Sequence, residues 1–166
     1  MHPTFGVLYI PSTEDLIEQT YQSILLEERL DITHLLLLFS IFASASFAWS
    51  PQLLVKLNAT QEEANSAGTA YTRLATSILD NTHPSVVPST IALAAISNLA
   101  HLVTGSEGYS IKAHLLQTRC LVMARELHVH RLDTAKSREE RKLNGCNEIE
   151  IEVQRRVWWN MVAFDW

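Results

Sequence analysis

The chain has 166 residues, of which 47% are hydrophobic and 19% charged, as expected for one folded domain rather than a disordered segment. It contains only five glycines and five prolines, and an all-β chain would need more turn residues than this. The formal net charge is −5, and acidic residues nearly cancel the basic ones between residues 119 and 156. Because a DNA-binding surface carries an uncompensated basic stripe, we expect no direct nucleic-acid contact from this chain.

The cysteine content and the first residues bear on the compartment. The two cysteines, Cys120 and Cys146, are too few for a disulfide framework and fit a reducing intracellular environment. Residues 1–10 lack the basic segment and apolar run of a secretory signal. We therefore expect an intracellular protein.

The first predicted element is an amphipathic helix. Ser12 is expected to cap it, with Glu14 and Asp15 in its first turn, where the helix dipole favours negative charge. Apolar residues then recur at helical spacing. The predicted inward stripe consists of Leu16, Ile17, Tyr21, Ile24 and Leu25.

Residues 32–49 carry no Asp, Glu, Lys or Arg, and they fit either a core helix or a membrane anchor. A membrane-spanning helix needs about 20 predominantly apolar residues, whereas His34 and three serines interrupt this run and Pro51 follows it. No cluster of Lys or Arg flanks the segment to set an orientation. We predict a core helix buried on most sides. The alternative is a small membrane-anchored helical protein that uses residues 32–49.

Two helices are predicted next. Pro51 is expected in the first turn of a short helix over 52–57. Thr60 and Glu63 form a capping-box pattern, which predicts a helix over about 61–80. Its expected inward side chains are those of Ala64, Ala67, Gly68, Tyr71, Leu74, Ala75, Ile78 and Leu79.

After a proline-bounded loop, Ser89 or Thr90 is expected to cap another helix, which the glycine-containing segment 105–108 would end. A further helix is predicted over about 110–127. Its expected inward side chains are Ile111, Leu115, Leu116, Val122, Met123 and Leu127.

A polar connection over about 129–147 precedes the last predicted helix. This helix begins near Glu148, has an acidic first turn and runs to Trp166. The whole pattern predicts an all-α, irregular bundle of about seven helices.

The sequence offers little for catalysis or metal binding. It contains no nucleophile elbow, no phosphate-binding loop and no aspartate-rich magnesium motif. His128 and His130 with Cys120 and Cys146 form the only metal-like grouping, and zinc sites use closely spaced pairs instead. We therefore expect no catalytic residue, cofactor or metal site on this chain, and a helical enzyme is the weaker alternative.

The C-terminal segment is unusual because three tryptophans lie within residues 158–166. Glu152, Arg155 and Arg156 lie at the i, i+3 and i+4 spacings that place side chains on neighbouring helix faces. Tryptophan side chains bury large areas. We predict a core helix whose arginines pair with acidic groups elsewhere.

This segment resembles a known family signature. Glu152, Arg155, Arg156, Trp158, Trp159 and Asp165 match the E-x-x-R-R-x-W-W-x-x-x-x-x-D pattern in the middle homology region of fungal zinc-cluster transcription factors. Residues 113–131, which end in His130 and Arg131, are similar to the helix and His-Arg segment that precede this pattern in the family. The resemblance is specific over 110–166 and looser back to residue 12, so we treat 1–166 as part of one such domain.

The resemblance implies a non-catalytic, all-helical regulatory domain of a nuclear transcription regulator. The signature residues, with His130 and Arg131, would be structural determinants of that domain. In the family a separate six-cysteine cluster binds zinc and DNA, usually as a dimer, and this chain lacks it; zinc is expected only there. The implied partners are other parts of the full-length factor, transcriptional cofactors and a small-molecule inducer, with no membrane. Family members continue beyond the Trp-Trp helix, so we expect a C-terminally truncated fragment.

Overall fold

The computed structural model describes residues 8–81 and 85–164, and these residues form eight α-helices without a β-strand. This confirms the predicted all-α fold. The helices are α1 Ile10–Leu25, α2 Ile32–Phe47, α3 Pro51–Leu57, α4 Gln61–Asp80, α5 Thr90–Glu107, α6 Ile111–Glu126, α7 Ala135–Asn144 and α8 Glu148–Phe164, with a 3₁₀ turn η2 at Val129–Arg131.

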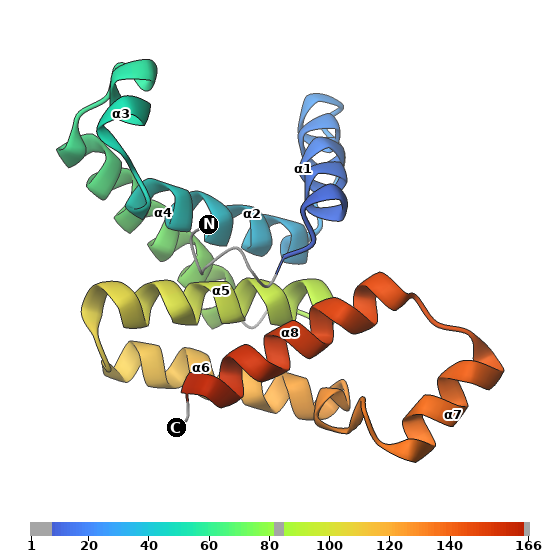
Figure 1. Ribbon diagram of the computed structural model, residues 1–166. Helices are drawn as coiled ribbons and strands as arrows, with labels where there is room; N and C mark the ends of the chain where they lie inside the picture. The colour runs from blue at the N-terminus through green and yellow to red at the C-terminus, as the bar shows by residue number, and fades with distance from the viewer. Residues whose placement is uncertain (1–7, 82–84, 165–166) are drawn as a thin grey trace.

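Helix α5 lies at the centre of the bundle (Figure 1). It packs against α2 on one side and against α6 and α8 on the other, and α4 covers the other face of α2. Helices α1, α3 and α7 lie at the periphery, and neither α3 nor α7 has a buried residue. The arrangement is therefore a layered core of five helices with three projecting ones.

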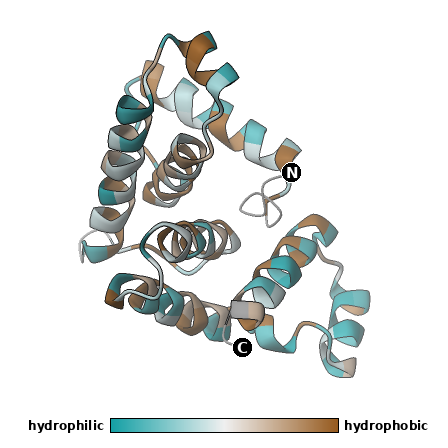
Figure 2. Cartoon of the chain, turned by 60° about the vertical axis from the view of Figure 1, so that its left-hand side comes forward, coloured by the Kyte–Doolittle hydropathy of each residue, from teal (hydrophilic) through white to brown (hydrophobic). Residues whose placement is uncertain are grey.

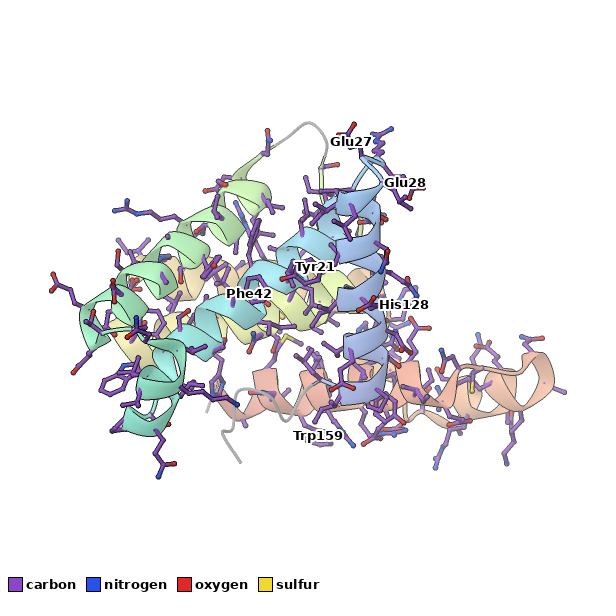
Figure 3. All side chains as sticks on the ribbon, turned by 90° about the horizontal axis from the view of Figure 1, so that it is seen from above. Tyr21, Glu27, Glu28, Phe42, His128 and Trp159 are labelled. Atoms are coloured by element: carbon purple, nitrogen blue, oxygen red, sulfur yellow. The ribbon has the colours of Figure 1, made fainter. Side chains whose placement is uncertain are left out.

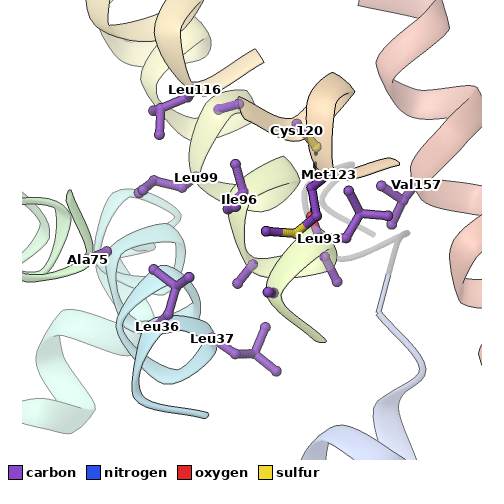
Figure 4. Close-up of a cluster of buried hydrophobic side chains, with 14 of the residues drawn as sticks. Leu36, Leu37, Ala75, Leu93, Ile96, Leu99, Leu116, Cys120, Met123 and Val157 are labelled. Carbon is purple, nitrogen blue, oxygen red and sulfur yellow. Dashed lines mark hydrogen bonds between the residues drawn. The ribbon is translucent and has the colours of Figure 1, made fainter. Parts of the chain in front are cut away.

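Small side chains explain the central position of α5. Every residue from 92 to 100 is buried, and alanines and a serine alternate with Leu93, Ile96 and Leu99. A helix that is apolar all round is stable only when it is covered on all sides. Figure 4 shows these leucine and isoleucine side chains between those of α2, α6 and α8. Ala92 and Ala95, both fully buried, leave room for close helix approach.

Helix α2 confirms the prediction of a core helix at residues 32–49. Leu36, Leu37, Leu38 and Ala43 are buried in it. The buried Asn98 of α5 donates from Nδ2 to the Ser40 carbonyl at 3.0 Å, so a polar contact joins the two central helices. Within the described ranges, no single helix is long and apolar enough to cross a membrane. Helices α2 and α3 together reach such a length and composition, and they are bent by 115° at their break.

Helix starts agree well with the sequence, with one exception. The capping box at Thr60 and Glu63 is present, and Ser89 and Ser110 cap α5 and α6. The predicted cap at Ser12 is wrong, because α1 already begins at Ile10 and its N-cap residue makes no side-chain bond. Pro11 lies in its first turn, where the fixed φ of proline suits a helix start.

Helix α6 has apolar side chains on two opposite faces, and the predicted inward set mixes residues of both. Leu116 and Met123 are buried as predicted, together with Ala113, Cys120 and Ala124. Ile111, Leu115 and Val122, predicted to point inward, are exposed on the opposite face. Small residues on the buried face let α6 approach α5 closely, so packing distance decided which face was buried.

Other predictions also need correction. In α1 only Leu16 of the predicted stripe is buried; Ile17 is half-buried, while Tyr21, Ile24 and Leu25 are exposed. Leu74 of α4, predicted to point inward, is exposed. Helix α5 does not end where the glycine-containing segment 105–108 begins but continues to Glu107. The predicted polar connection 129–147 contains helix α7. The hydrophilic residues of α7 give no apolar period (Figure 2), which is why the sequence did not reveal this helix.

Truncation of a central α5 side chain should be costly. We expect Leu93→Ala, at a fully buried position, to lower the free energy of unfolding by about 2–5 kcal/mol, because it leaves a cavity in a close-packed core. Leu143→Ala on α7, where the side chain is 84% exposed, is the matched control and should change it by less than about 0.5 kcal/mol. Chemical denaturation of both variants is the measurement, and equal losses would contradict the central role of α5.

Candidate functional site

The candidate site is the face where α8, which carries the family signature, meets α5 and the η2 turn. Val157 of α8 is fully buried, and Val153 and Met161 pack against the core beside it. These residues lie one turn apart on one face of α8, so the sequence there forms a helix with a single apolar side. The core thereby fixes the rotation of α8 about its own axis.

Polar contacts fix the start of α8. The hydroxyl of Thr90, in the first turn of α5, donates to Glu150 Oε1 at 2.6 Å and accepts from the buried Gln154 Nε2 at 2.7 Å. Asn147 caps α8 by accepting from the backbone N–H groups of Ile149 and Glu150. Thr90 therefore joins the starts of two helices that are about 60 residues apart in the sequence.

Arg155 connects α8 to the turn before α7. Its Nε and Nη2 donate to the two carboxylate oxygens of Asp133, at 3.1 and 3.0 Å, and its Nη1 donates to Glu152 at 2.8 Å. Arg156 Nε donates to the other oxygen of Glu152 at 3.0 Å. The bidentate geometry between Arg155 and Asp133 is the strong form of an arginine–carboxylate pair. The four side chains make a linear series of ion pairs, from Asp133 through Arg155 and Glu152 to Arg156, with two cations and two carboxylates.

The network changes the proton affinities of its carboxylates. The hydrogen bond from Arg155 lowers the pKa of Asp133, and nearby Arg141 and Arg138 add to the effect. Hydrogen bonds from Arg156 and Arg155 lower the pKa of Glu152. The hydrogen bonds of Arg155 to Asp133 and to Glu152 raise the pKa of Arg155. All of these groups are therefore charged at neutral pH and serve as ion pairs rather than as proton donors or acceptors.

The η2 turn brings a histidine to the signature tryptophan. His128 has a φ of 55°, which reverses the chain after α6. The reversal buries Val129 and places the His130 ring against Trp158, with 6.2 Å between ring centroids. His130 of the segment that precedes the signature therefore lies beside Trp158 of the signature itself.

The signature residues do not all share one environment. Trp158 is half-buried against the core, whereas Trp159 is 60% exposed and lies at the rim of the molecule (Figure 3). Arg131 is also exposed. Asp165 lies outside the described residues. The structure therefore brings together Glu152, Arg155, Arg156 and, separately, His130 with Trp158.

Sequence reasoning missed the partners of these residues. Asp133 and Thr90 complete the contacts of α8, and neither belongs to the signature. Asp133 is one of several acidic residues in a polar stretch, so no sequence spacing identifies it as the partner of Arg155. Thr90 was considered only as a helix cap, a role that Ser89 fills.

Several hollows and the buried Cys120 thiol lie near α8. A hollow of about 310 Å³ lies between α1, α2, α5 and α8, with Leu16, Ile91 and Val153 among its apolar lining and Glu150 among its polar lining. Within the described part of the chain, no three His, Cys, Asp or Glu side chains are placed to hold a metal ion. Burial raises the pKa of the Cys120 thiol to about 12, so this cysteine is a protonated core residue.

Comparison with known proteins gives three curated relatives. An Aspergillus flavus protein named "Probable transcription factor lepB" is 30% identical over 96% of this chain. The agnestins biosynthesis cluster transcription factor AgnL11 of Paecilomyces divaricatus and the transcription factor TAS2 of Pyricularia oryzae are 22% and 25% identical over the same share. The curated homologues of this chain are fungal transcription factors.

These homologues are much longer than the chain. It spans 29% of the Aspergillus flavus protein, 23% of the Paecilomyces divaricatus protein and 20% of the Pyricularia oryzae protein. No family model matches the chain, and no solved structure matches it. The likeness to fungal transcription factors nevertheless extends over nearly the whole chain, well beyond the signature helix.

The Arg155 network should make stability depend on acid. Asp133 and Glu152 have native pKa values below their ordinary 3.8 and 4.5, so their contribution is present above those values and is lost as the pH falls through the native ones. We expect Arg155→Gln to lower Tm by about 2 °C at pH 7. This difference from the wild type should begin to shrink below about pH 4.5 and should approach zero only below the lowered native pKa values of Asp133 and Glu152. A Tm difference that does not shrink at all as the pH falls below 3.8 would show that Arg155 acts through packing instead. Lys136→Gln is the control, since Lys136 lies 3.9 Å from Glu140 and outside this network.

The two adjacent tryptophans should contribute unequally. We expect Trp158→Ala to lower the free energy of unfolding by about 2–3 kcal/mol, less than for a fully buried tryptophan, because the ring is only half-buried. Trp159→Ala should cost under about 1 kcal/mol, because that side chain is 60% exposed. Urea denaturation measures both, and an equal or reversed order would contradict this placement of the signature residues.

Proposed function

We propose that this chain is a non-catalytic regulatory domain of a fungal transcription factor and that residues 1–166 are part of the middle homology region. The observation that carries the proposal is the similarity to named transcription factors over 96% of the chain. In this proposal the DNA-binding zinc cluster belongs to another part of the full-length factor, which acts in the nucleus. No nucleic acid is contacted by this chain.

The chemistry of the site supports a structural rather than a catalytic role. Its carboxylates at Asp133 and Glu152 are engaged by arginines, and the Cys120 thiol is buried and donates to the Leu93 carbonyl at 3.8 Å. A general acid or base needs a pKa near the working pH and access to a substrate. Carboxylates that arginines keep ionised therefore favour a structural role over a catalytic one.

Regulation would then act through contacts at the α8 face. Arg155 of the signature connects α8 to the segment before α7 through Asp133, and Trp159 offers an exposed aromatic ring to another part of the factor or to a transcriptional cofactor. Aromatic side chains with low side-chain entropy are common anchors in such contacts. A small-molecule inducer would enter the apolar hollow between α1, α2, α5 and α8.

The proposal is tested by tethering. The chain is fused to an unrelated DNA-binding domain in a fungal host, and transcription from a reporter with the matching site is measured. We expect a change in reporter output of at least about threefold relative to the DNA-binding domain alone, in either direction, because a regulatory domain acts on whatever promoter it is brought to.

The matched control is Val157→Asp, which places a charge at a fully buried position and should unfold the domain. Loss of the reporter effect in this variant, at equal protein level, would tie the effect to the folded bundle. An unchanged reporter with the wild-type fusion, or an effect that survives Val157→Asp, would contradict the proposed function.

A further inference from the structure

Helix α7 is held by charge rather than by packing. None of its ten residues is buried, and Leu143, its one large apolar side chain, is 84% exposed. Figure 1 shows α7 projecting from the bundle beside the start of α8. A ten-residue helix without tertiary packing is marginal in water. The ion pair between Asp133 and Arg155 attaches the segment just before α7 to α8. Since no residue of α7 fills the core, its side chains are free for another role.

One face of α7 forms a hollow with α8. The hollow has a volume of about 210 Å³. Arg138, Arg141 and Lys142 of α7 line it at the i, i+3 and i+4 spacing that places side chains on one face. From α8 the lining comprises Glu148, Ile151 and Arg155. Two separate helices thus contribute charged groups to one small space.

The charges of this hollow are not balanced. Arg155 already directs its Nε, Nη1 and Nη2 to Asp133 and Glu152. Among the described residues, no carboxylate lies within ion-pair distance of the three α7 cations. Glu148 is the only acidic residue in the lining, and it accepts a hydrogen bond from Cys146 Sγ at 3.2 Å. With Arg155 counted as neutralised by Asp133 and Glu152, the other three cations of the lining and Glu148 leave a net charge of +2, in a chain whose total is −5.

We propose that this hollow binds a single phosphoryl group, as inorganic phosphate or as a phosphate monoester. A phosphate monoester carries a charge of about −1.5 to −2 at pH 7, which the net +2 of the lining matches. Two guanidinium groups and an ammonium group provide the fork-shaped and point-charge donors that bind phosphate oxygens.

The same observations disfavour other anions. A carboxylate side chain brings one negative charge and leaves half of the excess uncompensated. A nucleic-acid strand needs cations along a stripe, whereas the unpaired cations here are confined to one side of a ten-residue helix. The hollow therefore selects a compact dianion. Binding would join α7 to α8 and stabilise the helix that lacks packing.

The first experiment uses the full chain and inorganic phosphate, with chloride balancing the ionic strength. Calorimetric titration should show binding, and hydrogen exchange should slow at the amides of residues 135–144. Binding should strengthen between pH 5 and pH 7.5 as phosphate becomes a dianion, whereas sulfate, a dianion throughout, should show a much smaller change. No binding, or an effect that chloride reproduces, would overturn the proposal.

Variants locate the site. The double substitution Arg138→Gln and Arg141→Gln should weaken phosphate binding by at least about tenfold, since two charge-assisted interactions are removed. The matched control Lys136→Gln, on the same helix but outside the hollow, should change it less than about twofold. Glu148→Gln should tighten binding, because it removes the opposing charge. The substituted α7 side chains, Lys136, Arg138 and Arg141, are exposed or half-buried, so the circular dichroism spectrum of each variant should match that of the wild type. Equal phosphate affinities in all the variants would refute the assignment.

Peptide and DNA probes identify the source of the phosphoryl group. A phosphoserine peptide that binds more tightly than inorganic phosphate, while its unphosphorylated form does not bind, would identify a phosphorylated polypeptide as the ligand. Binding of inorganic phosphate alone would identify the free ion. Equal binding of a peptide with glutamate in place of phosphoserine, or tighter binding of a DNA duplex than of either phosphate probe, would contradict a site built for one phosphoryl group. The tethering assay does not depend on this hollow, so the two proposals can fail separately.

Discussion

The bundle depends on the burial of α5 from every side. Its run of buried residues, 92–100, alternates small side chains with Leu93, Ile96 and Leu99. The small side chains set short distances to α2 and α6, and the large ones fill the space between them. The polar Asn98 fits this core because it donates to the Ser40 carbonyl of α2. A helix of this kind cannot be stable alone, so the other central helices and α5 require one another.

Helix α8 makes its contacts through two chemically different faces. The apolar side, with Val157 at its centre, packs on the central helices. The polar side carries Arg155, which reaches Asp133 across 22 residues of sequence. The signature residues therefore serve two purposes: Trp158 packs against the core, and Arg155 and Arg156 form ion pairs. The ionic side is partly exposed, so its contribution to stability is small and sensitive to salt, and it positions the peripheral α7 rather than holding the fold together.

The sequence predicted those helices in which the spacing of the apolar residues and the capping residues indicate the same boundaries. The start of α4 is the clearest case, because Thr60 and Glu63 form a capping box whatever the tertiary structure is. Prediction failed where two faces were equally apolar, as in α6, and where no apolar period exists, as in α7. In the candidate site, the sequence predicted that the arginines pair with acidic groups elsewhere, and this is so for Arg155 with Asp133, whereas Arg156 pairs with Glu152 of its own helix. Asp133 could not be chosen as the partner from the sequence, because pairing between distant segments is decided by packing of the core.

The described structure separates a rigid interior from a periphery that is chemically diverse. Opposite its core face, α6 presents Ile111, Leu115 and Val122, all exposed and close to one line along the helix. The exposed end of α1 carries apolar residues such as Tyr21, and the acidic Glu27 and Glu28 lie in the turn that follows it (Figure 3). Substitutions on such surfaces change contacts without changing the core, because these side chains are exposed rather than packed in it. A domain arranged in this way can alter its interactions while its fold persists, which is what regulation by contact requires of a scaffold.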